Sequence, residues 1–162
     1  MDSKTRESLE GPKYALDHLA TKQAQELLTR ESNDRNGIGV DIEFIADINI
    51  DNETFVERNF TPAEQKYCNE RPNPHASFAG RWCAKEAIVK AISSLHLGRG
   101  KVWYKGDAAP LIEIEVLQAP SGAPFVVLHG DAKDAAAKAG VTTIRVSISH
   151  IDTFAIATAI TS

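Results

Sequence analysis

Hydrophobic and polar residues alternate along residues 37–45, a pattern typical of a β-strand whose two faces meet different surroundings. One face is apolar and carries Ile38, Val40, Ile42 and Phe44. The other face carries Gly39, Asp41 and Glu43. We expect the apolar face to pack into the core, which leaves the acidic face free for chemistry.

Three helices are predicted between residues 51 and 95. The first is short, and Asp51 or Asn52 can cap it. The second begins at Thr61-Pro62-Ala63-Glu64, which has the threonine, first-turn proline and third-position glutamate of a capping box. Prolines 72 and 74 separate it from a longer helix over residues 75–95. The apolar surface of this long helix consists of Phe78, Trp82, Ile88, Ile92 and Leu95.

The C-terminal part predicts two hairpins separated by a helix. Residues 111–117 and 125–128 form the first hairpin across a proline- and glycine-containing turn at residues 120–124. Residues 131–139 are rich in alanine, and Gly140 ends this helix in a left-handed conformation. Residues 143–149 and 154–159 form the second hairpin. The grouping predicts an α+β fold with helices packed on an antiparallel sheet.

Composition limits the classes of function. A chain of 162 residues can bury the core of one domain, and its net charge of −4 argues against broad binding of nucleic acid phosphates. No apolar run reaches the length of about 18–20 residues that crosses a bilayer. Cys68 and Cys83 lack metal-ligand spacing, so we expect reduced thiols near the core of a cytoplasmic protein.

Residues 1–36 are expected to lie outside the main domain at residues 37–162. Apolar residues recur at helical spacing within residues 12–30, and a polar run at residues 31–36 ends the pattern. This predicts an amphipathic helix followed by a linker. The helix either caps the domain or belongs to an upstream region.

Three carboxylates suggest a site for a divalent cation. Asp41 and Glu43 share a strand face, and Glu86 on the long helix would complete an oxygen site suited to Mg²⁺ if it lay opposite them. Each half alone has a simpler explanation. The strand acids could face solvent, and Glu86 could form a surface ion pair with Lys90 one turn away.

Three segments in this order resemble the 4'-phosphopantetheinyl transferase superfamily. They are Gly37-Ile38-Gly39-Val40-Asp41, Trp82-Cys83-Ala84-Lys85-Glu86-Ala87 and Ser147-Ile148-Ser149-His150. The resemblance extends from residue 37 to about residue 160 and is strongest to the transferase domain at the C-terminal end of fungal type I fatty acid synthase α chains. It implies transfer of 4'-phosphopantetheine from coenzyme A to a serine of an acyl carrier protein, with Mg²⁺ and release of 3',5'-ADP.

The resemblance also implies roles for individual residues. Asp41 and Glu86 carry over as metal ligands, whereas Glu43 either binds the metal directly or accepts a water. Lys90 is expected to meet a phosphate or the carrier, and Lys85 matches the same motif; both could equally be solvated lysines. The remaining expected contacts with coenzyme A are made by His150, Ser147, Ser149 and Arg81. The Arg81 guanidinium suits the 3'-phosphate. Alternatively, His150 is a structural residue and Arg81 a surface arginine.

Two other functions fit the same residues. A Mg²⁺-dependent nucleotide diphosphate hydrolase needs similar acids, and a carrier-docking domain could retain the site without activity. The resemblance further implies a homotrimer when the domain is isolated, or a place within a fatty acid synthase complex. An acidic carrier would meet basic residues, for which Arg58, Lys66 and Arg71 are candidates.

Overall fold

The computed structural model describes residues 36–95 and 110–162. The predicted helix at residues 12–30 and the predicted helix end at residues 98–100 lie outside these ranges. In chain order the elements are β1 (Gly37–Phe44), η1 (Ile45–Asp47), α2 (Glu53–Asn59), α3 (Pro62–Asn69), α4 (Pro74–Ser94), η2 (Leu111–Glu113), β2 (Ile114–Gln118), β3 (Pro124–Leu128), α5 (Gly130–Ala139), β4 (Ile144–His150) and β5 (Phe154–Thr161).

The predicted helix boundaries are confirmed by their caps. Asn52 accepts a hydrogen bond from the Phe55 amide at the start of α2. Thr61 and Glu64 form both hydrogen bonds of the capping box at the start of α3. Gly140 ends α5 with a φ of 78°, the left-handed conformation that glycine adopts without steric cost.

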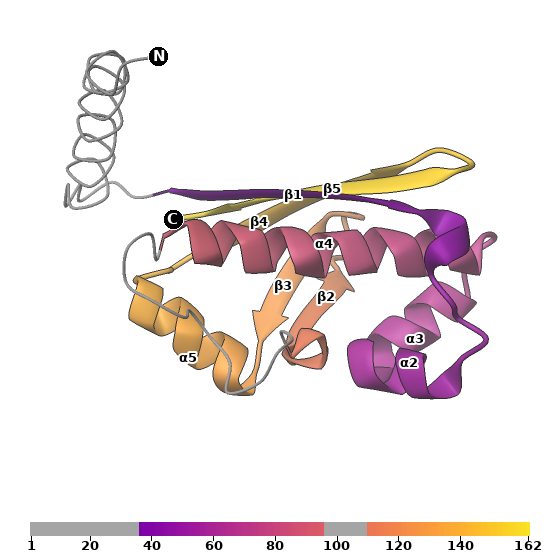
Figure 1. Ribbon diagram of the computed structural model, residues 1–162, viewed down its shortest axis with the longest axis horizontal. Coiled ribbons are helices and arrows are strands. Elements are labelled where there is room, and N and C mark those ends of the chain that lie inside the picture. Colours follow the sequence, from indigo (N-terminus) through magenta and orange to yellow (C-terminus); the bar gives the residue numbers. More distant parts are fainter. Residues whose placement is uncertain (1–35, 96–109) are drawn as a thin grey trace, which may run out of the picture. The chain divides into compact units, whose positions relative to one another are not determined.

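The strands form two antiparallel sheets. One has the order β1-β5-β4 and the other pairs β2 with β3. Figure 1 shows α4 lying along the three-stranded sheet, with α2, α3, the β2–β3 pair and α5 on the other side of the helix. The α+β prediction is confirmed. The predicted strand at residues 111–117 is wrong at its start, where Leu111–Glu113 is a 3-10 turn.

Glycine and alanine let α4 approach the three-stranded sheet closely. A Cβ atom at Gly39 would lie 2.0 Å from the Ala87 carbonyl oxygen, and one at Gly37 would lie 2.2 Å from the Ala91 carbonyl oxygen. Four helical residues advance about 6 Å and two strand residues about 6.6 Å, so these contacts repeat along both elements. The neighbouring strand β5 presents alanines to the helix, namely Ala155, Ala157 and Ala159.

The prediction that the apolar face of β1 enters the core is wrong. Gly37, Gly39 and Asp41 are buried, whereas the apolar side chains of β1 are exposed. Close packing of α4 needs small residues, so it selects the glycine face of the strand. The exposed face, which we call the outer face, consists of Ile38, Val40, Ile42, Phe44, Ile156 and Ile160.

The core lies mainly on the opposite side of α4 from the outer face. Phe60, Phe78, Ile88, Ile92, Ile114 and Val116 are fully or almost fully buried there. Both cysteines are buried and free, as predicted. Within the described residues, no helix is long and apolar enough to cross a membrane.

Candidate active site

Asp41 occupies a buried position between β1 and α4. Its Oδ1 atom accepts a hydrogen bond from Lys90 Nζ at 2.7 Å, and Lys90 also donates to the Val40 carbonyl at 3.2 Å. The second oxygen, Oδ2, is buried and has no hydrogen-bond partner among the described residues. A buried carboxylate oxygen without a partner costs free energy, so this atom is placed to accept a ligand.

Glu86 lies one helical turn before Lys90 and is partly buried. Burial raises its pKa, the negative charges of Asp41 and Glu43 raise it further, and Lys90 opposes this shift. The hydrogen bond to Asp41 raises the pKa of Lys90. Asp41, Glu43, Glu86 and Lys90 therefore lie near enough to influence one another's charge, and their joint binding of a metal remains a prediction.

The acids fit a magnesium ion with two protein ligands better than one with three. In residues 36–95 and 110–162, no group of three or more His, Cys, Asp or Glu side chains is arranged to hold a metal ion. Mg²⁺ is commonly bound by one or two carboxylates together with substrate phosphates and water. Asp41, with its unpartnered Oδ2, and Glu86 are the two candidates for such a site, and metal binding by them, as by Glu43, remains a prediction.

Cys83 is a buried residue of α4 that lies near Asp41 and Glu43. Its thiol donates to the Ala155 carbonyl at 3.4 Å. Burial, with the nearby charge of Asp41, raises its pKa to about 12, so the thiol stays protonated at neutral pH. Cys83 therefore adds no negative charge beside Asp41.

Arg81 lies in a second location, a pocket of about 210 Å³ that it lines with Tyr67, Arg71 and His150. The Arg81 guanidinium stacks on the Tyr67 ring at 3.9 Å from the ring centroid. The residue is buried, and its Nε has no hydrogen-bond partner in the part of the chain that the structure describes. Because Arg81 lines the pocket, its guanidinium charge suits an anionic group there.

Strand register relates this pocket to the acidic position. Glu43, Ala155 and His150 are directly opposite one another across β1, β5 and β4, so their side chains lie on the same sheet face, toward α4. Two strand spacings separate Glu43 from His150, which is about 10 Å. Asp41, Glu43 and His150 therefore lie on the same face of the three-stranded sheet.

Ser147 and Ser149 lie on the opposite sheet face. Ser147 pairs through Thr158 with Val40, and Ser149 through Ile156 with Ile42, so both serines are exposed with the outer face. Within one chain they are not brought together with Asp41. The alternation of side chains along β4 explains this, because His150 is one residue removed from Ser149.

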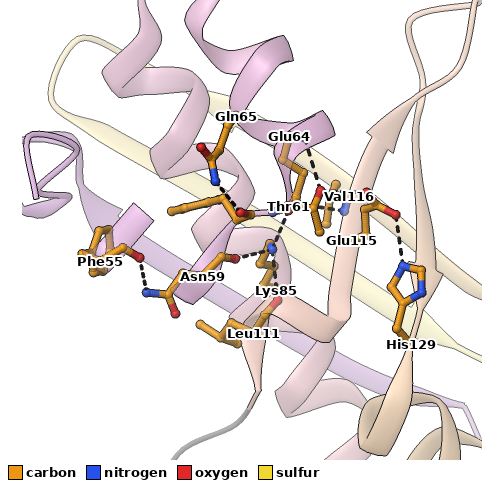
Figure 2. A network of polar contacts seen from close by, with 11 residues as sticks. Phe55, Asn59, Thr61, Glu64, Gln65, Lys85, Leu111, Glu115, Val116 and His129 are labelled. Atoms are coloured by element: carbon orange, nitrogen blue, oxygen red, sulfur yellow. Dashed lines mark hydrogen bonds and ion pairs between the residues drawn. The ribbon is translucent and has the colours of Figure 1, made fainter. Parts of the chain in front are cut away.

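Lys85 does not lie where the motif predicted a ligand-binding lysine. It is fully buried and forms an ion pair with Glu64 at 2.7 Å. Its ammonium also donates to the carbonyls of Asn59 and Leu111, as Figure 2 shows. All three of its protons have acceptors, and burial lowers its pKa although Glu64 opposes this. Lys85 therefore has no free donor for a phosphate.

Sequence reasoning missed Tyr67 and the partners of Lys85. Tyr67 is a half-buried residue of α3, and a helical tyrosine gives no signal that it will support an arginine from another helix. Glu64 was recognised only as a helix cap, and its second role depends on a contact with a residue 21 positions away. Arg58, Lys66 and Arg71 are exposed, and their predicted contact with a carrier remains a prediction.

The chain is similar to a known protein family and to fatty acid synthase subunits. A model of the 4'-phosphopantetheinyl transferase superfamily matches residues 37–159. The chain is 50% identical over 140 residues to fatty acid synthase subunit alpha of Schizosaccharomyces pombe and 45% identical over 144 residues to that of Saccharomyces cerevisiae. These matches cover 86% and 89% of this chain, which spans about 7% of the length of either relative.

Solved structures of holo-acyl-carrier-protein synthases share the fold. The Chronobacterium ammoniagenes enzyme in complex with coenzyme A is 29% identical, with a TM-score of 0.68 and coverage of 79% of this chain and 97% of that chain. The Helicobacter pylori enzyme in complex with coenzyme A is 32% identical, with a TM-score of 0.59 and coverage of 77% and 99%.

Proposed function

Because this chain belongs to the 4'-phosphopantetheinyl transferase superfamily, we propose that it transfers 4'-phosphopantetheine from coenzyme A to a serine of an acyl carrier protein. The serine hydroxyl loses its proton to solvent, and its oxygen forms a bond to the phosphorus nearest the pantetheine. The bond from that phosphorus to the bridging oxygen breaks, and 3',5'-ADP leaves with the electron pair. The similarity to fatty acid synthase α subunits supports a carrier of fatty acid synthesis as the acceptor.

The observation that carries this proposal is the Asp41–Glu86 pair with its unpartnered Asp41 Oδ2. A magnesium ion bound there would neutralise charge on the diphosphate and orient the phosphorus for in-line attack. Asp41 supplies an oxygen fixed on a strand, and Glu86 supplies one from a helix packed directly against that strand. Both ligands are therefore held by rigid elements.

Lys90 and the Arg81 pocket supply the cationic contacts of the proposal. The Lys90 side chain is 51% exposed, so its ammonium can move from Asp41 to a phosphate oxygen without unfolding α4. Arg81 and His150 line a pocket too small for a whole coenzyme A but adequate for one phosphate group. We assign them the 3'-phosphate end of the substrate. Lys85 is left out because its donors are already used.

Assembly of three copies explains two further features. The outer face exposes six large apolar side chains, with Ile38 70% exposed, which is unusual for a surface facing water. We propose that copies of this domain associate through this face as a homotrimer. Ser147 and Ser149 on the same face would then lie near a neighbouring copy and could contribute to its coenzyme site.

Mass spectrometry of the carrier tests the function. The protein is incubated with coenzyme A, Mg²⁺ and an apo acyl carrier protein, and the carrier is weighed. A mass increase of one phosphopantetheine supports transfer. Cleavage of coenzyme A without an adduct would instead identify a diphosphate hydrolase, and no reaction would identify a silent carrier-docking domain.

A further inference from the structure

Lys85 and Glu64 form an ion pair from which water is excluded. Both side chains have 0% exposure, and Nζ and Oε2 are 2.7 Å apart. Glu64 also accepts hydrogen bonds from the backbone amides of Thr61 at 2.8 Å and Val116 at 2.9 Å. Every charged atom of the pair therefore has partners, the condition under which a buried pair is tolerated.

The pair joins α4 to several separate segments (Figure 2). Lys85 reaches the carbonyl at the end of α2 and the carbonyl of Leu111 in η2. Glu64 adds the first turn of α3 and strand β2. Thr61 extends the connections through Glu115, whose other oxygen contacts His129 before α5. Lys85 thus joins α4 directly to α2, α3 and η2, and Glu64 extends the connection to β2.

The other side of α4 packs on the sheet through Gly39, Ala87 and similar small residues, which permit close approach but have few protruding atoms to interlock. The hydrogen bonds on this side come from Ser94, Cys83 and Lys90, and the Lys90 side chain is 51% exposed. On the opposite side, the fully buried Lys85 ammonium has three acceptors, so it adds directional contacts that help to set the position of the helix about its axis.

We infer that Lys85, held by Glu64, is a positioning residue that sets the rotation of α4 and thereby places the adjacent Glu86 carboxylate opposite Asp41. Neighbouring helical residues differ by 100° in direction, so Lys85 facing the α3–β2 layer leaves Glu86 directed elsewhere, toward β1. A rotation of about 20° would move a side-chain end, which lies about 5–6 Å from the helix axis, by about 2 Å. Mg²⁺ requires oxygen distances close to 2.0–2.1 Å and does not tolerate such a shift. The inference rests on the proposed magnesium-dependent function.

The test uses the double variant Lys85→Met/Glu64→Gln, which removes the pair without leaving a buried charge unpaired. Ile92→Val is the matched control, since Ile92 is equally buried on α4 but belongs to the apolar core. Three quantities are measured in each protein: the thermal unfolding midpoint, the Kd of coenzyme A without metal, and the Kd of Mn²⁺ for the protein–coenzyme A complex by electron paramagnetic resonance.

We expect the double variant to bind coenzyme A within twofold of the wild type, while its Mn²⁺ Kd rises at least tenfold. The control should lower the unfolding midpoint and leave the Mn²⁺ Kd within twofold. An unchanged Mn²⁺ Kd in the folded double variant would overturn the inference. A large rise in the Kd of coenzyme A measured without metal would also overturn the inference, because it would indicate that Lys85 binds the substrate.

A milder variant covers the case in which the double variant does not fold. Glu64→Gln alone retains a side-chain acceptor but removes the charge that holds Lys85, and we expect its Mn²⁺ Kd to rise about threefold; no rise would contradict the inference. Failure of the proposed function is distinguishable, because the wild-type complex itself would then bind no Mn²⁺ and modify no carrier.

Discussion

Asp41 uses its two carboxylate oxygens differently, and this difference is central to the site. Oδ1 is held by Lys90, whereas Oδ2 is buried without a partner. The ion pair keeps the carboxylate oriented while one oxygen remains able to bind a cation. Lys90 is thus the partner of the proposed metal ligand and an exposed cation beside it.

Replacing Lys90 by Met should weaken substrate binding more than it affects folding. We expect the KM for coenzyme A to rise about tenfold, since one charge-assisted phosphate contact is lost. Steady-state kinetics with an apo carrier measure this. Lys138→Met on exposed α5 is the control, and equal KM values for both variants would contradict the role of Lys90.

Cys68 makes a prediction about stability at alkaline pH. Burial raises the pKa of its thiol from 9.0 to about 11, although Arg81 opposes this shift. Between these values the unfolded chain loses this proton and the folded chain keeps it, so folding stability falls as pH rises above 9.0. We expect the unfolding free energy of Cys68→Ala to depend less steeply on pH than that of the wild type. The difference between the two slopes should correspond to at most about one bound proton. Identical slopes in denaturant titrations from pH 9 to 11 would contradict this.

At the scale of elements, the match between α4 and β1 defines the site. The glycines of β1 bring the helix close enough for Glu86 to share a neighbourhood with Asp41. The capping residues of α2 and α3 were predictable because local hydrogen bonds determine them. The buried face of β1 was not, because the choice of the glycine face depends on a helix more than 40 residues away.

Gly39→Ala should therefore disrupt the fold near the site. Its Cβ would lie 2.0 Å from a backbone oxygen of α4, so the helix must move, and we expect destabilisation of about 1–3 kcal/mol with loss of transfer activity. Gly80→Ala on α4 is the matched control, since its Cβ would meet a side-chain methyl group of Ile148 at 2.8 Å and no backbone atom. Denaturant unfolding measures both, and equal stability losses would contradict the packing argument.

At the scale of the whole molecule, the predicted site residues divide among several places. Asp41, Glu43, Glu86 and Lys90 gather beside β1, Arg81 and His150 line a pocket, and the two serines lie on the outer face. Motifs identify residue types in chain order but do not give the sheet face on which each lies. The exposed apolar outer face is the basis of the proposal that a complete site involves more than one copy.

A charge on the outer face tests this assembly. Val40 is 52% exposed, and we expect the wild-type domain to sediment as a trimer and Val40→Lys as a monomer in analytical ultracentrifugation. Phe125→Lys, at a 43% exposed position on β3, should leave the trimer intact. A wild-type monomer, or a trimer that survives Val40→Lys, would contradict the proposed interface.

The most direct test of the shared cation is ³¹P nuclear magnetic resonance of bound coenzyme A in the presence of Mn²⁺. In the wild type, we predict that Mn²⁺ broadens the two diphosphate resonances much more than the 3'-phosphate resonance. In Asp41→Asn/Glu86→Gln, coenzyme A should remain bound while this selective broadening is lost. Equal broadening in the two proteins would show that these carboxylates do not hold the cation against the diphosphate.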